Sequence, residues 1–303
     1  MENKGFLDKP DFMQNTEEKQ EISSEKPLIS SGIKFIDLLD TSVKDTFILP
    51  SKGHWYADLG EEYANGLVTV RAMTTQEQKK LLGGGKPEAK FEMWLNSCVK
   101  FPSGNSINFN KLISSDIQFL LIVIRAMGIS VNYPVKVRCE ECSYKEDYQI
   151  NLIKDLQVHF IPENFTATEP FSFELPYKKD TIEYRLPRRA DEKEIERYKK
   201  RELKSRYYKP EQGDPTFDYS YALRIKTING EEVDLREKLE QFAKWTNKDQ
   251  IALQHDHAQY ESGIDPVISL NCKNCGEDII GELKLTKEFL HPRSEFGRYS
   301  TNT

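Results

Sequence analysis

The pattern of apolar and polar positions predicts several helices, one of them deeply buried. Residues 115–128 carry apolar side chains almost all round the predicted helix, including Ile117, Leu120 and Ile124, which is typical of a helix inside a protein. Gly128 is the kind of residue that adopts a left-handed conformation just past a helix end. Capping pairs and helical spacing predict further helices at residues 74–83, 90–99, 191–206, 217–225, 235–242 and 246–263.

Short runs of β-branched and aromatic residues predict strands between these helices. The first run begins at Ile48 and leads into a turn at residues 50–56. The remaining strand patterns lie at residues 67–71, 131–138, 148–152, 171–175, 181–186, 267–270 and 279–285. Helices and strands together indicate an α+β fold.

Composition and pattern divide the chain into four parts. Residues 1–30 and 291–303 are polar and aperiodic, so we expect disordered tails, because such segments bury too little apolar surface to offset the entropy of ordering. Between them we expect an N-terminal α/β domain over residues 31–130. A split four-cysteine zinc ribbon then covers residues 131–290, and its insertion, at residues 188–263, is expected to be largely helical.

Charge and hydropathy restrict the possible classes of protein. The formal net charge of −6 argues against a surface devoted to nucleic acid, although it allows a local basic patch. The longest apolar run, residues 119–124, is far shorter than the roughly 20 residues of a membrane-spanning helix. No apolar stretch follows the charged residues at the N-terminus, so we expect no secretory signal and a protein that stays in the reducing cytoplasm.

Four of the five cysteines form two C-x-x-C pairs in similar frames. A predicted strand precedes each pair, and a polar turn and a second strand follow it; the pairs are Cys139 with Cys142 and Cys272 with Cys275. Two such hairpins facing each other would place four thiolates about 2.3 Å from one zinc ion. Gly276 suits the tight turn after the second pair, while Ser143 takes the same place after the first.

The distance between the pairs is unusual for a zinc ribbon. Residues 143–271 separate them, whereas about 15–20 residues intervene in an ordinary ribbon, so the ribbon must be split by an insertion. The alternatives to zinc are an iron–sulfur cluster, a redox dithiol, or no metal. Because four cysteines leave no open coordination position, we expect a structural Zn²⁺ and no catalytic role for it. The fifth cysteine, Cys98, is expected to be a packed small residue.

No set of residues suitable for catalysis is evident. The chain has no G-x-S-x-G motif, and His255 and His257 are too close in sequence for a zinc-protease pair; we expect His255 to be half-buried beside Ile251. Residues 188–209 contain ten Lys or Arg against five Asp or Glu. Because the signs are mixed, a solvent-exposed helix is a better interpretation of this segment than a nucleic-acid surface.

Several motifs outside the cysteines resemble the T4-type bacteriophage baseplate hub and hub-assembly family. They are the turn Leu49-Pro50-Ser51-Lys52-Gly53, the strand and capped helix at residues 66–77, the C-x-x-C hairpin after the apolar helix, and the element at residues 173–187. The resemblance spans about residues 45–190 and extends more weakly to 290. The charged segment 188–263 carries no matching motif.

This resemblance implies a structural or assembly protein of a contractile tail baseplate, without enzyme activity or a small-molecule substrate. Its partners would be other tail and baseplate proteins, and it would act in the host cytoplasm during assembly, in the virion baseplate, or in both. The main alternative is a zinc-ribbon nucleic-acid-binding or transcription factor. A redox or metal-dependent enzyme is a third, weaker alternative.

Overall fold

A computed structural model describes residues 32–34, 46–82, 87–205, 213–283, 285 and 289. The fold is mixed α+β with several small antiparallel sheets, which confirms the predicted fold class. The tails predicted at residues 1–30 and 291–303 lie outside the described residues. The division into domains at residue 130 stays a prediction.

Helices account for much of the described chain. They are the 3₁₀ helices η1 (His54–Leu59) and η2 (Phe109–Lys111), and the α-helices α2 (Glu61–Ala64), α3 (Thr75–Leu82), α4 (Pro87–Cys98), α5 (Ser114–Gly128), α6 (Arg189–Glu202), α7 (Thr216–Ala222), α8 (Leu235–Phe242) and α9 (Asn247–Ala258).

Every described strand pairing is antiparallel. The strands form the sheets β1–β7–β12 (Gly32–Lys34, Gln157–His159, Gly263–Asp265), β2–β3–β4 (Thr46–Ile48, Leu67–Val70, Val99–Lys100), β5–β6 (Asn132–Arg138, Lys145–Asn151), β8–β9–β10–β11 (Phe171–Glu174, Thr181–Tyr184, Ile225–Ile228, Glu231–Glu232) and β13–β14 (Val267–Asn271, Asp278–Glu282).

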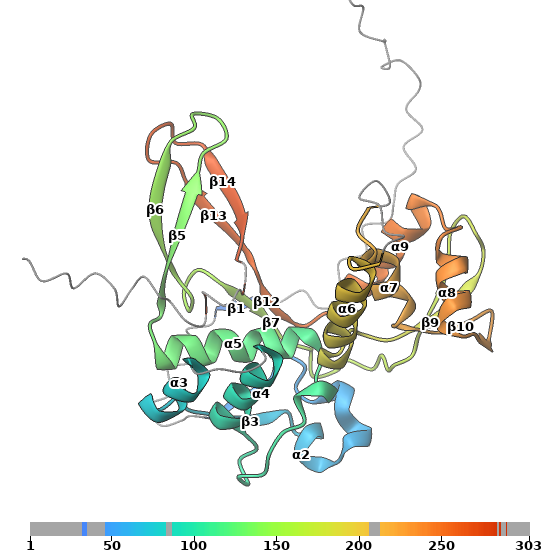
Figure 1. The fold of residues 1–303 in the computed structure, drawn as a ribbon, viewed down its shortest axis with the longest axis horizontal. Coiled ribbons are helices and arrows are strands. Elements are labelled where there is room, and N and C mark those ends of the chain that lie inside the picture. Colours follow the sequence, from blue (N-terminus) through green and yellow to red (C-terminus); the bar gives the residue numbers. More distant parts are fainter. Residues whose placement is uncertain are drawn as a thin grey trace, which may run out of the picture.

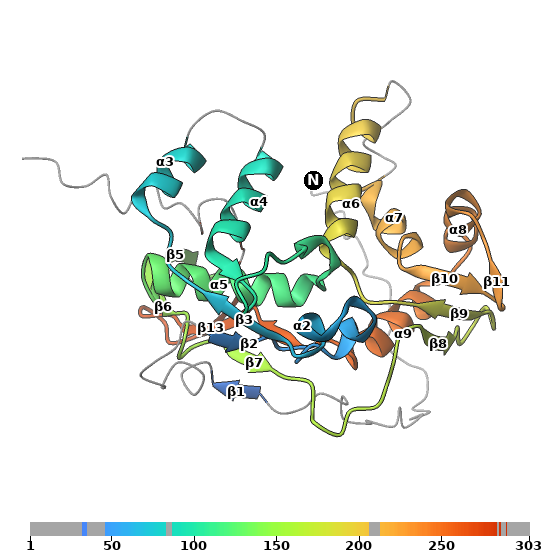
Figure 2. The same ribbon diagram turned by 90° about the horizontal axis from the view of Figure 1, so that it is seen from below.

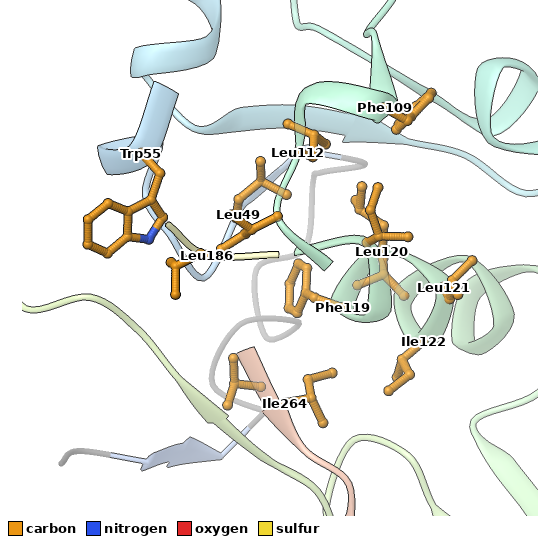
Figure 3. Close-up of a cluster of buried hydrophobic side chains, with 14 of the residues drawn as sticks. Leu49, Trp55, Phe109, Leu112, Phe119, Leu120, Leu121, Ile122, Leu186 and Ile264 are labelled. Carbon is orange, nitrogen blue, oxygen red and sulfur yellow. The ribbon is translucent and has the colours of Figure 1, made fainter. Parts of the chain in front are cut away.

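Helix α5 is the central element, as its apolar pattern predicted. Nine consecutive positions from Ile117 to Arg125 include only one exposed side chain, that of Gln118. In Figure 1 the helix crosses the middle of the molecule, with α3 and α4 on one side, two long hairpins on the other, and α6–α9 beyond its N-terminal end. The core around it includes residues from distant segments, and Figure 3 shows Phe119, Leu186 and Ile264 in one cluster of buried side chains.

A buried polar cluster fixes the turn after β2 to the first turn of α5. The Asp116 carboxylate accepts the Ser51 hydroxyl at 2.5 Å, the Ser51 backbone N–H at 3.1 Å and the Tyr56 hydroxyl at 2.6 Å. All three residues are buried. Burial raises the pKa of Asp116, and the hydrogen bonds from Ser51 and Tyr56 oppose that rise. The turn also requires glycine, since a Cβ on Gly53 would lie 2.2 Å from the carbonyl oxygen of Ala64.

One predicted helix cap and one predicted helix boundary are wrong. Gly128 is the last residue of α5 and not a left-handed cap, because the Arg125 carbonyl accepts both the Ile129 and the Ser130 N–H and closes the helix without one. Helix α9 ends at Ala258, five residues before Gly263. Gly263 belongs to β12, where a Cβ would lie 2.8 Å from the Cβ of Ser115, so glycine there allows β12 to pack closely on α5.

The predicted helix at residues 217–225 is also too long. It ends at Ala222, and Ile225 begins strand β10. Ile228 of β10 pairs with Ile182 of β9 and both are buried, so strand pairing outweighs the helical spacing of Ile225. The segment predicted as a largely helical insertion therefore also contributes two strands to a sheet (Figure 2).

The Asp116 cluster yields a stability prediction. Replacing Ser51 with Ala removes the hydroxyl bond to a buried carboxylate, and we expect it to lower the free energy of unfolding by about 2 kcal/mol. Urea denaturation followed by circular dichroism measures this change. Ser103→Ala is the matched control, because Ser103 donates to Glu62 at the surface and its loss should cost less than about 0.5 kcal/mol. Equal effects of the two substitutions would contradict the role of the cluster.

Candidate metal centre

Two hairpins bring the four predicted cysteine ligands together. Strands β5 and β6 pair from Asn132 with Asn151 to Arg138 with Lys145, and β13 pairs with β14 from Val267 with Glu282 to Asn271 with Asp278. Each C-x-x-C pair lies in the connection between the two strands of its hairpin. Figure 1 shows the hairpins side by side with their turns at the same end.

The two turns have the same backbone hydrogen bonds. In the first, the Cys139 N–H donates to the Tyr144 carbonyl at 2.9 Å, and the Ser143 N–H donates back to the Cys139 carbonyl at 3.0 Å. In the second, Cys272 and Gly276 repeat this pattern, each bond at 2.8 Å. Ser143 has a φ of 59° and Gly276 a φ of 78°, so both occupy the left-handed conformation that the turn requires.

The four sulfur atoms are arranged as a metal ion would need them. All lie within 4.8 Å of one another. Two short approaches join one hairpin to the other, at 3.7 Å between the sulfur atoms of Cys139 and Cys275 and 3.6 Å between those of Cys142 and Cys272. Thiolates around a tetrahedral zinc ion stand about 3.8 Å apart. A disulfide needs about 2.05 Å, so the cysteines are free thiols at metal-binding spacing.

The proton affinities of two of the thiols diverge. A hydrogen bond from the Asn274 side chain is the main cause that lowers the pKa of Cys142 to about 6. The backbone N–H of Glu277 also lowers the pKa of Cys275, but desolvation and the neighbouring sulfurs outweigh it and raise that pKa to about 12. Sulfur atoms this close repel one another when they carry negative charge. A bound cation removes the conflict, because a coordinated thiol loses its proton.

Contacts beside the cysteines also hold the hairpins together. The Tyr148 hydroxyl in β6 donates to the Asn271 carbonyl at 3.1 Å and lies 3.4 Å from the Lys273 backbone N–H. The Lys273 ammonium pairs with Glu146 and lies 5.1 Å from the centre of the Tyr148 ring. The sequence pattern did not single out these residues. Tyr148 occupies a buried position of an alternating strand, which is the only signal it gives.

The composition of the cluster limits its chemistry. Within the described part of the chain the group consists of the four cysteines alone, with no histidine or carboxylate among them. Thiolates favour zinc, iron or copper(I) over magnesium or calcium. A complete set of four protein ligands leaves no position for a substrate, which is typical of a structural site.

Other residues considered for chemistry have ordinary roles. Cys98 is buried, as predicted, and burial raises the pKa of its thiol to about 11. The expectation for His255 is wrong, because both it and Ile251 are exposed on α9. His257 is the more buried histidine, with its Nδ1 3.2 Å from the Glu261 carboxylate. No helix in the described ranges is long and apolar enough to cross a membrane.

The charged helix α6 is only partly exposed. In the first half of the helix, the Lys193 ammonium forms an ion pair with Glu92 of α4. Arg188, the residue that precedes the helix, forms an ion pair with Glu169 at 2.5 Å. The prediction of a wholly solvent-exposed helix is therefore wrong for this half. Side chains farther along are exposed, including Arg197, and residues 206–209 of the predicted helix lie outside the described ranges.

Two facing knuckle hairpins form a ribbon within an α+β fold, and their four cysteines are clustered suitably for a metal ion. The chain belongs to the T4 bacteriophage base plate protein family, whose family model matches residues 43–291. This match confirms the resemblance seen in the motifs, and it includes segment 188–263, which those motifs did not cover. No curated protein and no solved structure matches the chain.

The geometry of the site yields a prediction about metal content. The purified protein should carry about one metal ion per chain, and Cys139→Ser or Cys272→Ser should abolish stoichiometric binding, because each removes a ligand from a different hairpin. Inductively coupled plasma mass spectrometry after anaerobic purification measures the content. Cys98→Ala is the matched control, since Cys98 is outside the cluster and its loss should leave the metal in place. Full metal content in both serine variants would refute the site.

Proposed function

We propose that this protein is a structural or assembly component of a contractile tail baseplate hub, and that it acts through protein–protein contacts. The observation that carries the proposal is the family match over residues 43–291, which includes both cysteine pairs. The partners are other tail and baseplate proteins. The protein acts without catalysis or a small-molecule substrate. It acts in the host cytoplasm during assembly, in the tail baseplate of the virion, or in both.

We further propose that the four cysteines hold one structural Zn²⁺. The short sulfur–sulfur approaches cross between the hairpins, Cys139 to Cys275 and Cys142 to Cys272, which supports a single shared ion. A redox dithiol would bring together the two sulfurs of one C-x-x-C pair. A two-iron cluster would bind the pairs to different metal ions and separate them more widely.

The proposed zinc ion would join the two hairpins, which lie at the two ends of a long intervening segment of the chain. Cys139 and Cys275 are 136 positions apart in the chain. Closing so long a loop costs a few kcal/mol of chain entropy, on the order of (3/2)RT ln n. Structural zinc contributes about 10 kcal/mol or more in small zinc fingers, so it can outweigh that cost. The ion would thereby keep the hairpins in a fixed position for contacts with tail proteins.

The alternative function, a zinc-ribbon nucleic-acid-binding protein, finds little support in α6. The exposed half of this helix pairs its cations with its own carboxylates: Arg197 with Glu194 and Lys200 with Glu196. The carboxylates between these cations lower the local positive potential, which weakens the attraction of this surface for phosphate groups. We therefore assign the exposed half of α6 to protein contact.

This assignment predicts weak DNA binding. Fluorescence anisotropy with a labelled duplex should give no saturable complex at 150 mM salt, roughly the physiological ionic strength. Replacing Arg197, Lys200 and Arg201 with Ala should change little. A tight complex that weakens steeply with salt and disappears in the triple variant would favour the nucleic-acid function instead.

The baseplate role predicts an assembly defect. In cells infected with phage that lack this gene product, plasmid-borne wild type should restore infectious particles, whereas Cys139→Ser or Cys272→Ser should reduce the titre strongly, because the hairpins lose their common anchor. Cys98→Ala should complement like wild type. Electron microscopy of lysates from cells without the protein, or with either serine variant, should show tails without complete baseplates. Normal tails in the absence of the protein would refute the proposed role.

A further inference from the structure

The two hairpins of the metal centre form an arm with two different outer faces. Side chains alternate along each strand, and the inward positions are buried or half-buried. Tyr148 and Ile150 in β6 and Ile268 in β13 are the buried ones. The Tyr148 hydroxyl reaches the backbone carbonyl of Asn271, so the inward face of β5–β6 contacts β13. The outward faces, which carry the exposed positions of each hairpin, therefore lie on opposite sides of the arm.

The outward face of β13–β14 is apolar and acidic. Ile280 is 74% exposed, the highest value of any large hydrophobic residue in the described chain, and Val267 is 51% exposed. Ile280 pairs with Ser269 and Val267 with Glu282, so the two apolar side chains are diagonal neighbours. Glu282 and Asp278 flank them, and no Lys or Arg lies on these strands. We call this surface the acidic face.

The outward face of β5–β6 has the opposite charge. Lys136, Arg138 and Lys145 point outward, against a single carboxylate from Asp147. The Lys136–Asp147 pair is long, at 3.9 Å, and both side chains are largely exposed, so it contributes little. Pro134 adds an apolar contact position on the same side. We call this surface the basic face.

We propose that copies of this protein associate through their arms, the acidic face of one copy on the basic face of the next. Opposite charges favour this pairing and repel pairing of like faces. Burying Ile280 and Val267 against a second copy removes apolar surface from water. Because the two faces lie on opposite sides of one arm, each copy can use both at once. Such a head-to-tail contact repeats and gives a closed ring or an open chain.

A single arm-to-arm contact is small, so the association should be clearest where several contacts act together. Ring closure makes the last contact intramolecular and strengthens the whole assembly without any new surface. The inference goes beyond the proposed baseplate role and does not depend on it, since purified protein suffices to test it. The zinc content of each variant is measured as well. A variant that no longer associates but keeps its zinc has lost the contact and not the metal centre.

Charge reversal tests the pairing. Asp278→Lys with Glu282→Lys makes the acidic face basic, and Lys136→Glu with Arg138→Glu makes the basic face acidic. Each double variant alone should remain monomeric in sedimentation velocity at low salt, because both of its faces then carry the same sign. An equimolar mixture should associate again, since every contact between the two variants joins opposite signs. Wild type should associate, and less so at high salt.

Controls make the result decisive. Both variants should retain wild-type metal content and circular dichroism. Lys226→Glu with Glu231→Lys reverses exposed charges on β10 and β11, away from the arm, and should associate like wild type. A monomeric wild type at all concentrations, variants that associate as wild type does, or a mixture that stays monomeric would each overturn the proposal. Binding of a different tail protein to the acidic face of a monomer would overturn it as well.

Discussion

The approach of four sulfur atoms to within 4.8 Å is the constraint on which the architecture of this protein depends. It joins two turns that are separated by more than a hundred residues of intervening chain. Neither hairpin has a large core of its own, and β13–β14 in particular exposes Val267 and Ile280. Two-stranded ribbons of this size are marginal in water by themselves. The arm is therefore expected to depend on the metal centre and on the contacts around Tyr148.

Helix α5 connects the two hairpins with the rest of the fold. The C-terminal end of α5 leads directly into β5. Near this end the buried guanidinium of Arg125 lies 4.8 Å from the centre of the Tyr133 ring, and it donates a hydrogen bond to the backbone carbonyl of Phe289. Its N-terminal end holds the Asp116 cluster and so fixes the turn that contains Ser51. One rigid helix thus connects the arm with the N-terminal sheet. This connection gives the arm a defined position relative to the N-terminal sheet.

Local signals predicted much of the structure from sequence. The C-x-x-C pairs, their flanking strands and the left-handed position at Gly276 follow from short-range patterns, and the cap of α3 at Thr74 with Glu77 is present as expected. What sequence could not give are contacts made across the chain. Ser51 and Tyr56 meet Asp116 from 65 and 60 positions away, and no periodicity encodes such a meeting. The sequence pattern predicts a helix at Ile225, whereas the structure has a strand there, because its partner strand β9 lies far from it in the sequence.

Hydrogen exchange with and without a chelator tests the shared metal centre most directly. If one ion joins both turns, removing it should speed exchange in β5–β6 and β13–β14 together, because each hairpin loses its support at the same moment. Helix α5 should keep much of its protection, since its core contacts do not involve the cysteines. Mass spectrometry of peptic fragments resolves these segments. Faster exchange beside only one of the turns, with the other still protected, would mean that the two pairs do not share a metal, and the split ribbon would have to be abandoned.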